Sequence, residues 1–379
     1  MTDPKREANF GDEDLVVKRT KLTDVDSERA KDNGKGDVVA SERNKELFTL
    51  SDNQNTPDVE QKLPRESTKN TLLPEPSESS KDGSSCNSEV LCQQVTKQFS
   101  IEADAAEDKG SRHTMEDAWV VLPDASLEYP GKLRCAHFAI YDGHGGRLAA
   151  EYAQAHLHAN VLSAGLPREL MDVKAAKKAV LEGFKRTDET LLQESAKGNW
   201  QDGATSVCLW VLGQTVIVAN IGDAKAVLAR TSSSTTQNQL NETDCPLKAI
   251  VITREHKAIY PQERARIQKA GGFVGPNGRL QGRLEVSRAF GDRQFKKVGV
   301  IATPDVHSFE LTEKDHFIIL GCDGLWGVFG PSDAVDFVQK QLKDNSSALT
   351  AARRLVKEAV RERRCKDNCT AIVIVFRQH

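Results

Sequence analysis

The chain has 379 residues, of which 52 are Lys or Arg and 55 are Asp or Glu, giving a formal net charge of -3. This length allows one large domain or two ordinary ones, with room for a sizeable core. A slightly acidic chain lacks the basic character of most nucleic-acid-binding domains, so we expect no nucleic-acid partner.

Neither a secretory signal nor a membrane span is expected. The first residues carry charges instead of an apolar signal core, and the longest apolar runs, such as 371–376, are too short to cross a bilayer. The 8 cysteines have no CxxC spacing, which favours free thiols in a reducing compartment over disulfides or a zinc site. We therefore expect a cytoplasmic or nuclear protein, in which Lys18-Arg-Thr-Lys21 is either a weak nuclear import signal or solvated charge.

Residues 1–94 are predicted to be a disordered polar tail. Up to about position 90 the chain is rich in Asp, Glu, Lys, Ser and Asn and has no Trp or Tyr. Such a segment cannot bury enough apolar surface to offset the entropy lost on ordering. All 4 Trp and all 4 Tyr lie beyond position 118, so we expect one folded domain over 95–379.

Strand and helix patterns alternate in this domain. Runs of β-branched and aromatic residues predict strands, and amphipathic spacing predicts helices. One expected helix, 147–162, places Leu148, Tyr152, Leu157 and Val161 on one face; Gly213-Gln214 predicts a tight antiparallel hairpin turn. The order favours α+β layers over a doubly wound parallel sheet. In chain order we expect a strand at 136–141, the helix at 147–162, a helix after the N-cap Asp172, strands at 207–212, 216–221, 226–228 and 249–252, a helix at 261–270, a strand at 316–320, a helix at 348–363 and a strand at 371–376.

Four acidic residues lie in four separate segments, three of them beside glycine or asparagine. Asp142 and Asp323 each follow a strand-like run and precede glycine. Asp367 precedes Asn368 and the last strand, and Glu116 lies in Arg112-His-Thr-Met-Glu-Asp117. Carboxylates at strand ends, with glycines that allow close backbone approach, suit hard divalent cations such as Mg²⁺ or Mn²⁺. The pattern predicts metal-assisted phosphate chemistry.

Each motif also has an ordinary interpretation. Asp-Gly is a common turn dipeptide, the 112–117 segment is compatible with a salt-bridged surface patch, and Asp367 is compatible with a helix cap. A buried carboxylate is costly unless it is paired, hydrogen-bonded or metal-bound, which favours a site at Asp323 and Asp367. Arg112 can bind a phosphate dianion bidentately, and His144 adds an imidazole two positions after Asp142.

Eight motifs in order resemble the type 2C metal-dependent serine/threonine protein phosphatases, over about residues 95 to 379. The resemblance implies a central β-sandwich of two antiparallel sheets flanked by α-helices, with a two-metal site at one end. The motifs are Arg112-x-x-Met-Glu-Asp117, Tyr141-Asp-Gly-His-Gly-Gly146, Asp202-Gly-Ala-Thr205, Ile221-Gly-Asp223, Glu255-His-Lys257, Glu285-Val-Ser-Arg-Ala-Phe-Gly-Asp292, Cys322-Asp-Gly-Leu-Trp326 and Lys366-Asp-Asn368.

The same resemblance implies a ligand set for two Mg²⁺ or Mn²⁺ ions. Asp142 would bridge both ions, and the Gly143 carbonyl would bind one of them. Asp323 and Asp367 would hold the other ion, while Glu116 would support the ion near Gly143, directly or through water. The remaining acids that match family positions near the site are Asp117, Asp223 and Asp292.

The implied reaction is hydrolysis of phosphoserine or phosphothreonine in proteins, by a monomer that uses water activated between two ions and forms no phospho-enzyme. Arg112 would grip the phosphate, His144 would be the general acid, and Arg279 would help on the substrate side. Family members often carry an acid at the position of Gly327 as a ligand for a third ion, so we expect no well-occupied third site.

Two rival functions remain open from the sequence. The first is a pseudophosphatase that keeps the fold and binds a partner protein; loss of metal ligands would mark it, and here the set is intact. The second is a metal-dependent hydrolase of nucleotides or nucleic acid, which would usually show a base-stacking or basic groove, and the composition indicates none.

Overall fold

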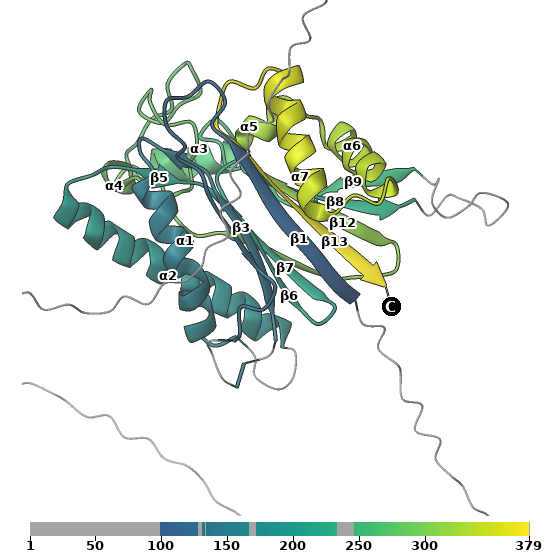
Figure 1. Ribbon diagram of the computed structural model, residues 1–379. Helices are drawn as coiled ribbons and strands as arrows, with labels where there is room; N and C mark the ends of the chain where they lie inside the picture. The colour runs from purple at the N-terminus through teal and green to yellow at the C-terminus, as the bar shows by residue number, and fades with distance from the viewer. Residues whose placement is uncertain (1–98, 128–130, 133, 167–171, 233–245, 379) are drawn as a thin grey trace, which may run out of the picture. The chain divides into compact units, whose positions relative to one another are not determined.

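The computed structural model describes residues 99–127, 131–132, 134–166, 172–232 and 246–378. The tail predicted at 1–94 lies outside the described residues. Within the described part, two five-stranded antiparallel sheets pack face to face, with helices on their outer faces (Figure 1). This arrangement confirms the predicted α+β sandwich.

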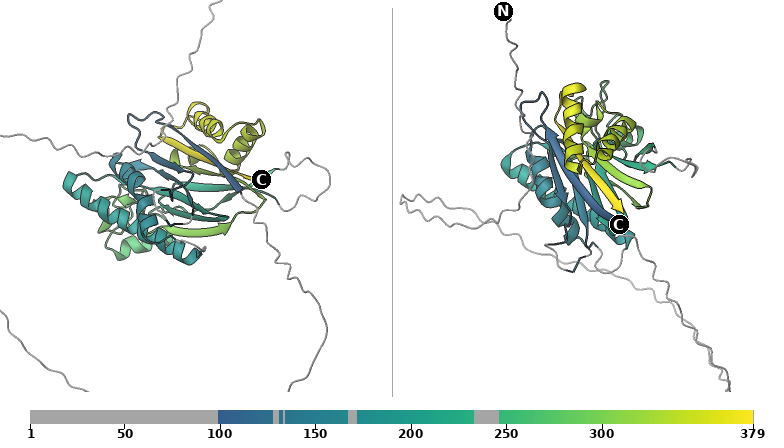
Figure 2. Two further views of the ribbon diagram at one scale, coloured as in Figure 1. Left: turned by 60° about the horizontal axis from the view of Figure 1, so that its bottom comes forward. Right: turned by 45° about the vertical axis from the view of Figure 1, so that its right-hand side comes forward.

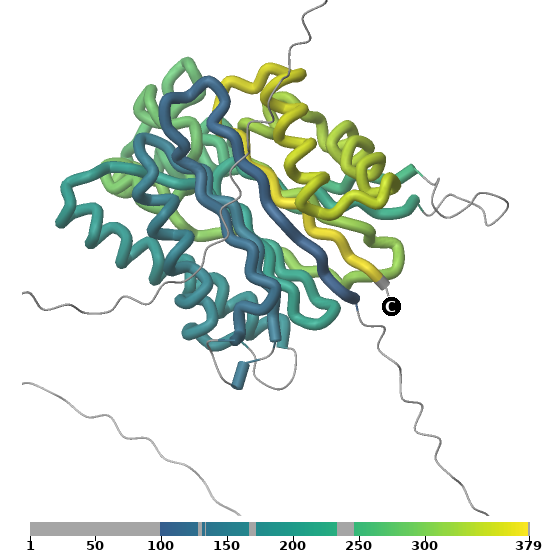
Figure 3. The backbone as a smooth tube through the Cα atoms, in the orientation of Figure 1, coloured from purple at the N-terminus to yellow at the C-terminus, as the bar shows by residue number. Residues whose placement is uncertain are grey.

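The first sheet contains both ends of the described chain. β1 pairs with β13 over its full length, from Phe99 opposite Gln378 to Asp108 opposite Cys369, and the two strands run side by side in Figure 3. The strand order in this sheet is β1 (Phe99–Asp108), β13 (Cys369–Gln378), β12 (Asp315–Gly321), β8 (Lys225–Thr231) and β9 (Leu247–Val251).

The second sheet is a meander with one added edge strand. Its β6 and β7 are joined by the two-residue turn predicted at Gly213-Gln214, because Leu212 pairs with Thr215. The strand order is β11 (Asp305–Glu310), β7 (Thr215–Ile221), β6 (Ser206–Leu212), β3 (Ala136–Tyr141) and β2 (Ala118–Leu122). A small third sheet orders β10 (Phe290–Gly291), β5 (Gly203–Ala204) and β4 (Gly143–His144).

The main core lies between the two large sheets. Phe138, Ile140 and Leu209 of the second sheet are fully buried together with Ile318 and Ile374 of the first. Burying each such side chain contributes about 1.5–3 kcal/mol relative to leaving it exposed. The β-branched and aromatic runs that predicted the strands therefore also supply the contact between the sheets.

Helices cover the outer face of each sheet, on opposite sides of the sandwich (Figure 2). α1 (Leu148–Ser163) and α2 (Val173–Gly198) pack on the second sheet, and Phe184 of α2 and Trp210 of β6 belong to one buried cluster. The two helices approach so closely that a Cβ on Gly183 would lie 2.3 Å from the Cγ2 atom of Val161. On the first sheet lie α6 (Pro331–Lys343), α7 (Ala348–Lys357) and a π-helical turn at Glu358–Glu362.

The predicted strands and helices are all present, with corrections at three places. Leu148 was expected on the buried face of α1, but its exposed fraction is 44% because Ala149, Ala150 and Ala153 face the core instead. The helix expected over 348–363 changes from α-helical to π-helical at Glu358. The sequence patterns missed β1, β2, β11 and α6, along with the short elements.

The segment between β9 and β11 forms a separate lobe with its own apolar cluster, which includes Ile267, Leu280 and Phe295. It contains α3 (Pro261–Lys269) and α4 (Arg293–Lys296). The cluster explains why a stretch with little regular structure is nevertheless ordered.

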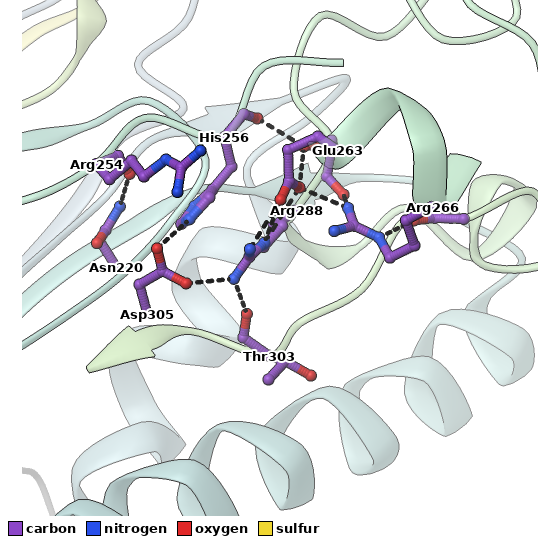
Figure 4. Close-up of polar contacts among 10 residues, drawn as sticks. Asn220, Arg254, His256, Glu263, Arg266, Arg288, Thr303 and Asp305 are labelled. Atoms are coloured by element: carbon purple, nitrogen blue, oxygen red, sulfur yellow. Dashed lines mark hydrogen bonds and ion pairs between the residues drawn. The ribbon is translucent and has the colours of Figure 1, made fainter. Parts of the chain in front are cut away.

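A partly buried polar network connects this lobe to β11 (Figure 4). Arg288 donates to Glu263 and to Asp305, each at 2.8 Å, and Arg266 donates to Glu263 at 2.6 Å. Burial alone would raise the pKa of Glu263, but hydrogen bonds from Arg288 and Arg266 hold it well below its ordinary value. His256 lies 3.1 Å from Asp305. The network fixes the position of the 285–292 segment relative to the sandwich.

Candidate metal and phosphate site

One end of the sandwich gathers acidic residues from both large sheets. β3, β7 and β12 end there and lead into Asp142, Asp223 and Asp323, while β2 and β13 begin there, shortly after Asp117 and Asp367. Except for Asp117, which lies beneath the surface, these acids line a cavity of about 570 Å³. Residues far apart in sequence therefore share one site, because antiparallel strands return to the same edge.

Three of these carboxylates converge. Asp142, Asp223 and Asp323 each offer one oxygen within 4.8 Å of the other two. Burial, followed by repulsion from Asp117, Asp323 and Asp223, raises the pKa of Asp142 well above its usual value. Burial and the charges of Asp223 and Asp367 raise the pKa of Asp323 to about 6. The acids thus destabilise one another's charged forms, and the nearby Lys257 offsets this only in part.

Asp117 supports this cluster from below. Its Oδ2 atom accepts a 2.6 Å hydrogen bond from the Thr370 hydroxyl, while the buried Oδ1 atom has no hydrogen-bond partner among the described residues. An oxygen of Asp117, one of Asp142 and the Cys322 thiol also lie within 4.8 Å of one another. Burial raises the pKa of Asp117 to about 7, against the lowering effect of Thr370. A buried oxygen without a donor is a costly feature unless something else satisfies it.

These features fit a divalent metal site. The converging side-chain donors are carboxylate oxygens, which hard cations such as Mg²⁺ and Mn²⁺ prefer. A dication placed among them would relieve the mutual repulsion and reverse the direction of the pKa shifts. Asp142 belongs to both acidic groups, so it is the residue best placed to touch two ions.

Glu116 and Gly143 are held together at the edge of the cluster. Glu116 accepts hydrogen bonds from the Gly146 amide at 3.1 Å and from the Thr114 hydroxyl at 3.2 Å. A Cβ on Gly143 would lie 2.3 Å from the backbone oxygen of Glu116, so glycine is required there. This close approach brings the Glu116 carboxylate beside the loop that follows Asp142.

Arg112 lines the cavity and binds Asp367. Its Nη2 atom donates to Asp367 Oδ2 at 2.7 Å, while its side chain remains 61% exposed. Asp367 lines the same cavity as Asp323 but is not among the three acids that converge within 4.8 Å. The guanidinium is therefore located where a phosphate bound at the acids would reach it.

His144 lies on another wall of the cavity and is paired with Asp292. The two side chains are 2.8 Å apart, and a Cβ on Gly203 would lie 2.3 Å from His144 Nε2 and 2.5 Å from the Asp292 carboxyl carbon. Burial alone would lower the pKa of His144, but Asp292 outweighs it, so the net pKa is raised. The structure thus brings Asp292, weakly indicated by the sequence, into direct contact with the imidazole.

A chain of charges runs from the acidic cluster to the rim. Lys257 lies 3.3 Å from Asp223 and 2.7 Å from Glu285, and Arg279 binds the other oxygen of Glu285 at 2.8 Å. Arg279 lines the cavity, but Lys257 and Glu285 lie between it and Asp223. Of the residues predicted for the substrate side, Arg112 therefore lies nearer to the acidic cluster than Arg279 does.

Three supporting residues were not assigned a role from the sequence. Asn368 accepts from the Glu116 amide at 2.8 Å and donates to the Thr114 carbonyl at 2.9 Å. Lys257 and Asn368 lie within motifs that were recognised, so their local pattern did carry a signal. Thr370, by contrast, is an ordinary strand residue in sequence, and only the fold reveals its bond to Asp117.

Comparison with known proteins agrees with this geometry. Residues 101–369 match the family model described as protein phosphatase 2C. A rice relative, probable protein phosphatase 2C 67, is 66% identical over 100% of both chains. The chain belongs to the protein phosphatase 2C family. As a member, it is a metal-dependent serine/threonine protein phosphatase, and phosphoproteins are its class of substrate.

Two further similar proteins match about three quarters of this chain. Probable protein phosphatase 2C 8 of Arabidopsis thaliana is 74% identical over 74% of this chain and 80% of that relative. A solved serine-threonine phosphatase 2C from Toxoplasma gondii superposes with a TM-score of 0.62 at 24% identity, covering 75% of this chain and 98% of that one. The latter likeness supports the fold.

Two further expectations concern thiols and membranes. Cys135, Cys208, Cys322, Cys365 and Cys369 are all free thiols, which agrees with the prediction for the cysteines that the structure describes. Within the described ranges, no helix has both the length and the apolar character needed to cross a bilayer.

Proposed function

We propose that this phosphatase 2C hydrolyses phosphoserine and phosphothreonine with water activated between two divalent cations, and that no phospho-enzyme forms. The observation that carries the proposal is the convergence of Asp142, Asp223 and Asp323 within 4.8 Å, in a cavity that Arg112 and His144 also line. When bound, the cations would supply a water of lowered pKa and positive charge for the phosphate.

The protein's own side chains supply the remaining chemistry. Arg112 offers a planar pair of N–H donors to the phosphate oxygens, where negative charge grows in the transition state. His144, held by Asp292, donates a proton to the serine or threonine oxygen as its bond to phosphorus breaks. A general acid at this step typically accelerates the reaction by about 10²–10⁴-fold.

In the proposed ligand set, Asp142 would contribute to both ions, Gly143 and Glu116 would help to hold one, and Asp323 and Asp367 would help to hold the other. Asp223 joins this set on the strength of its distance to Asp142 and Asp323. Its position also allows it to bind a third ion, for which Gly327 offers no side chain. We propose Mg²⁺ or Mn²⁺ as the ions, since both take octahedral oxygen ligands.

We also propose that the protein acts as a monomer in the cytoplasm or nucleus and binds no nucleic acid. The near-neutral charge balance supports the last point. Gel filtration with light scattering and imaging of the tagged full-length chain would test the first two points.

The discriminating experiment compares substrates and metals. Purified protein would be assayed on a phosphothreonine peptide, a phosphoserine peptide and a nucleoside triphosphate, with Mn²⁺, with Mg²⁺ and with a chelator. We expect peptide hydrolysis that the chelator abolishes and added metal restores. Faster hydrolysis of the nucleotide would favour the rival phosphoester hydrolase. Metal binding without any hydrolysis would favour a pseudophosphatase.

A further inference from the structure

A second cavity opens beside the first and shares its wall. It has a volume of about 290 Å³, and Arg112, Asp323 and Asp367 line both cavities. Its remaining lining comes from α5 (Asp323–Trp326), the residues just after it, and the turn that follows the π-helix. Any peptide whose phosphorylated residue enters the first cavity would therefore place a neighbouring residue near the second.

The charges in this second cavity are not balanced locally. Arg112 and Asp367 form a pair with each other, and Asp323 belongs to the acidic cluster. Arg364 and Lys366 are the other charged lining residues, and both are exposed. Neither side chain forms a hydrogen bond or ion pair with any residue that the structure describes. Two unpaired cations thus remain available to a ligand.

The backbone conformation of the turn places Arg364 and Lys366, but not Arg363, in the lining of the second cavity. Arg363, directly before them, is occupied elsewhere: it donates to the Val328 carbonyl at 3.2 Å and lies 3.7 Å from the centre of the Phe329 ring. Arg364 then adopts φ +59, a left-handed conformation that is uncommon for a residue with a side chain. Such departures from regular backbone, like the preceding π-helical turn, often occur at functional sites.

Hydrogen bonds hold the backbone of this turn at Cys365, between the two cations, and at Lys366. The Cys365 amide donates to the Ala359 carbonyl at 2.9 Å, and its thiol contacts the Gly324 carbonyl at 3.1 Å. The Lys366 carbonyl accepts from the Ser111 amide at 3.1 Å. The main chain is fixed while the charged side chains are free, an arrangement that suits recognition better than structural support.

Gly327 also affects the charge of this cavity, because it contributes no side chain to the lining. It lines the wall without a side chain, and its amide donates to the Asp323 carbonyl at 2.7 Å. An acid at this position would have opposed any negatively charged ligand. With glycine here, the cavity's unpaired charges are positive.

We propose that this second cavity, which we call the basic subsite and define by Arg112, Arg364 and Lys366, binds an acidic side chain next to the phosphorylated residue of the substrate. The proposal rests on the function proposed above and adds the substrate class to it: phosphopeptides with Asp or Glu flanking the phosphoserine or phosphothreonine. Arg112 lines both cavities. Its guanidinium therefore contacts the phosphate, while Arg364 and Lys366 bind the acidic side chain next to the phosphorylated residue.

The test compares peptides that differ only in the flanking residue. Phosphothreonine peptides would carry Asp, Asn or Lys at each position within three residues of the phosphothreonine. We expect kcat/KM at one or two positions to be about three- to tenfold higher with Asp than with Asn, which is what two exposed ion pairs contribute. The gain should appear mainly in KM, and it should shrink at high salt because exposed charges are screened.

Variants test whether Arg364 and Lys366 cause the preference for Asp over Asn. In the double variant Arg364→Gln/Lys366→Gln, the Asp-to-Asn ratio should fall to about one, a readout that is independent of how much total activity remains. Arg361→Gln is the matched control: it removes an exposed positive charge from the π-helix just before the turn, and Arg361 does not line the cavity, so the ratio should stay at the wild-type value.

Two results would overturn the basic subsite: a wild-type protein with no preference for Asp at any position, or a double variant that keeps the preference. If no peptide is hydrolysed at all, the proposed function fails instead. In that case, fluorescence anisotropy with the same labelled peptides still tests the subsite, because the affinity difference between Asp and Asn should persist and should disappear in the double variant.

Discussion

His144 Nε2 lies 2.8 Å from Asp292 Oδ2, although 148 positions separate the two residues in sequence. Asp292 is only 2% exposed, and its amide is held by the Asp202 carbonyl at 3.0 Å. The carboxylate therefore has a fixed position from which it can orient the imidazole and favour its protonated form.

Asp292→Asn should slow hydrolysis of phosphoserine peptides by about 10²-fold. Without the Asp292 carboxylate, the protonated form of His144 is less favoured, so less of the imidazole can act as a general acid. Aryl phosphates should be affected much less, because their leaving groups need little protonation. His144→Ala should show the same split between substrates. The double variant should be little worse than His144→Ala, and equal losses on both substrates would remove the general-acid role.

Gly203→Ala should separate the same pair without touching either side chain. The added methyl group would lie 2.3 Å from His144 Nε2, so the imidazole or the carboxylate must move. We expect kcat on phosphoserine peptides to fall at least tenfold while Mn²⁺ affinity changes little. Gly330→Ala is a control for substitution at a glycine, because Gly330 has a φ of -70 and nothing lies closer than 3.4 Å to its added Cβ. Unchanged kcat in Gly203→Ala would contradict the close approach of His144 and Asp292 to this glycine.

Asp323→Asn should abolish Mn²⁺-dependent phosphopeptide hydrolysis, because it removes one of the three converging carboxylates. The variant should bind Mn²⁺ at least tenfold more weakly by calorimetry, and added Mn²⁺ should raise its melting temperature less. Asp344→Asn removes an exposed acid at the end of α6 and serves as the control. Near-normal turnover in Asp323→Asn would refute its assignment as a ligand.

The Arg288 network should make the protein sensitive to acid. Burial favours raised pKa values for Glu263 and Asp305, but both pKa values are lowered in the folded state, by Arg288 at Glu263 and by His256 and Arg288 at Asp305. Their contribution to the free energy of unfolding is therefore present above the ordinary carboxyl pKa of about 4 and is lost as the pH falls through the lowered values. Urea unfolding at a series of pH values below 5 should show this decline.

Glu263→Gln tests the origin of that decline. The variant should lose about 3 kcal/mol at pH 7, because two arginines keep their charge without the buried partner, and its stability should depend less steeply on pH below 5. Glu189→Gln, on the exposed face of α2, should behave like the wild type. An unchanged acid slope in Glu263→Gln would show that other groups cause the decline.

The sequence predicted the central strands and the acids because both have strong local signatures. β13, with its run of Ile, Val and Phe, could be recognised alone, and Asp142 follows such a strand directly. β1 could not, because Phe99–Asp108 consists mostly of acids and alanines and becomes a strand only through its pairing with β13. The bond between Thr370 and Asp117 and the pair of His144 with Asp292 likewise depend on contacts over long stretches of chain, which no local pattern encodes.

The full-length pairing of β1 with β13 has a practical consequence for engineering. Phe99 and Gln378 are neighbours at one end of the sheet, and Asp108 and Cys369 are neighbours at the other end, near the acids. At about 3.4 Å per residue, the first pair lies roughly 30 Å away from the second. A circular permutant that joins 378 to 99 through a short glycine linker and opens at Gly213-Gln214 would keep every strand pair. Its new ends would emerge at a hairpin tip remote from the chemistry.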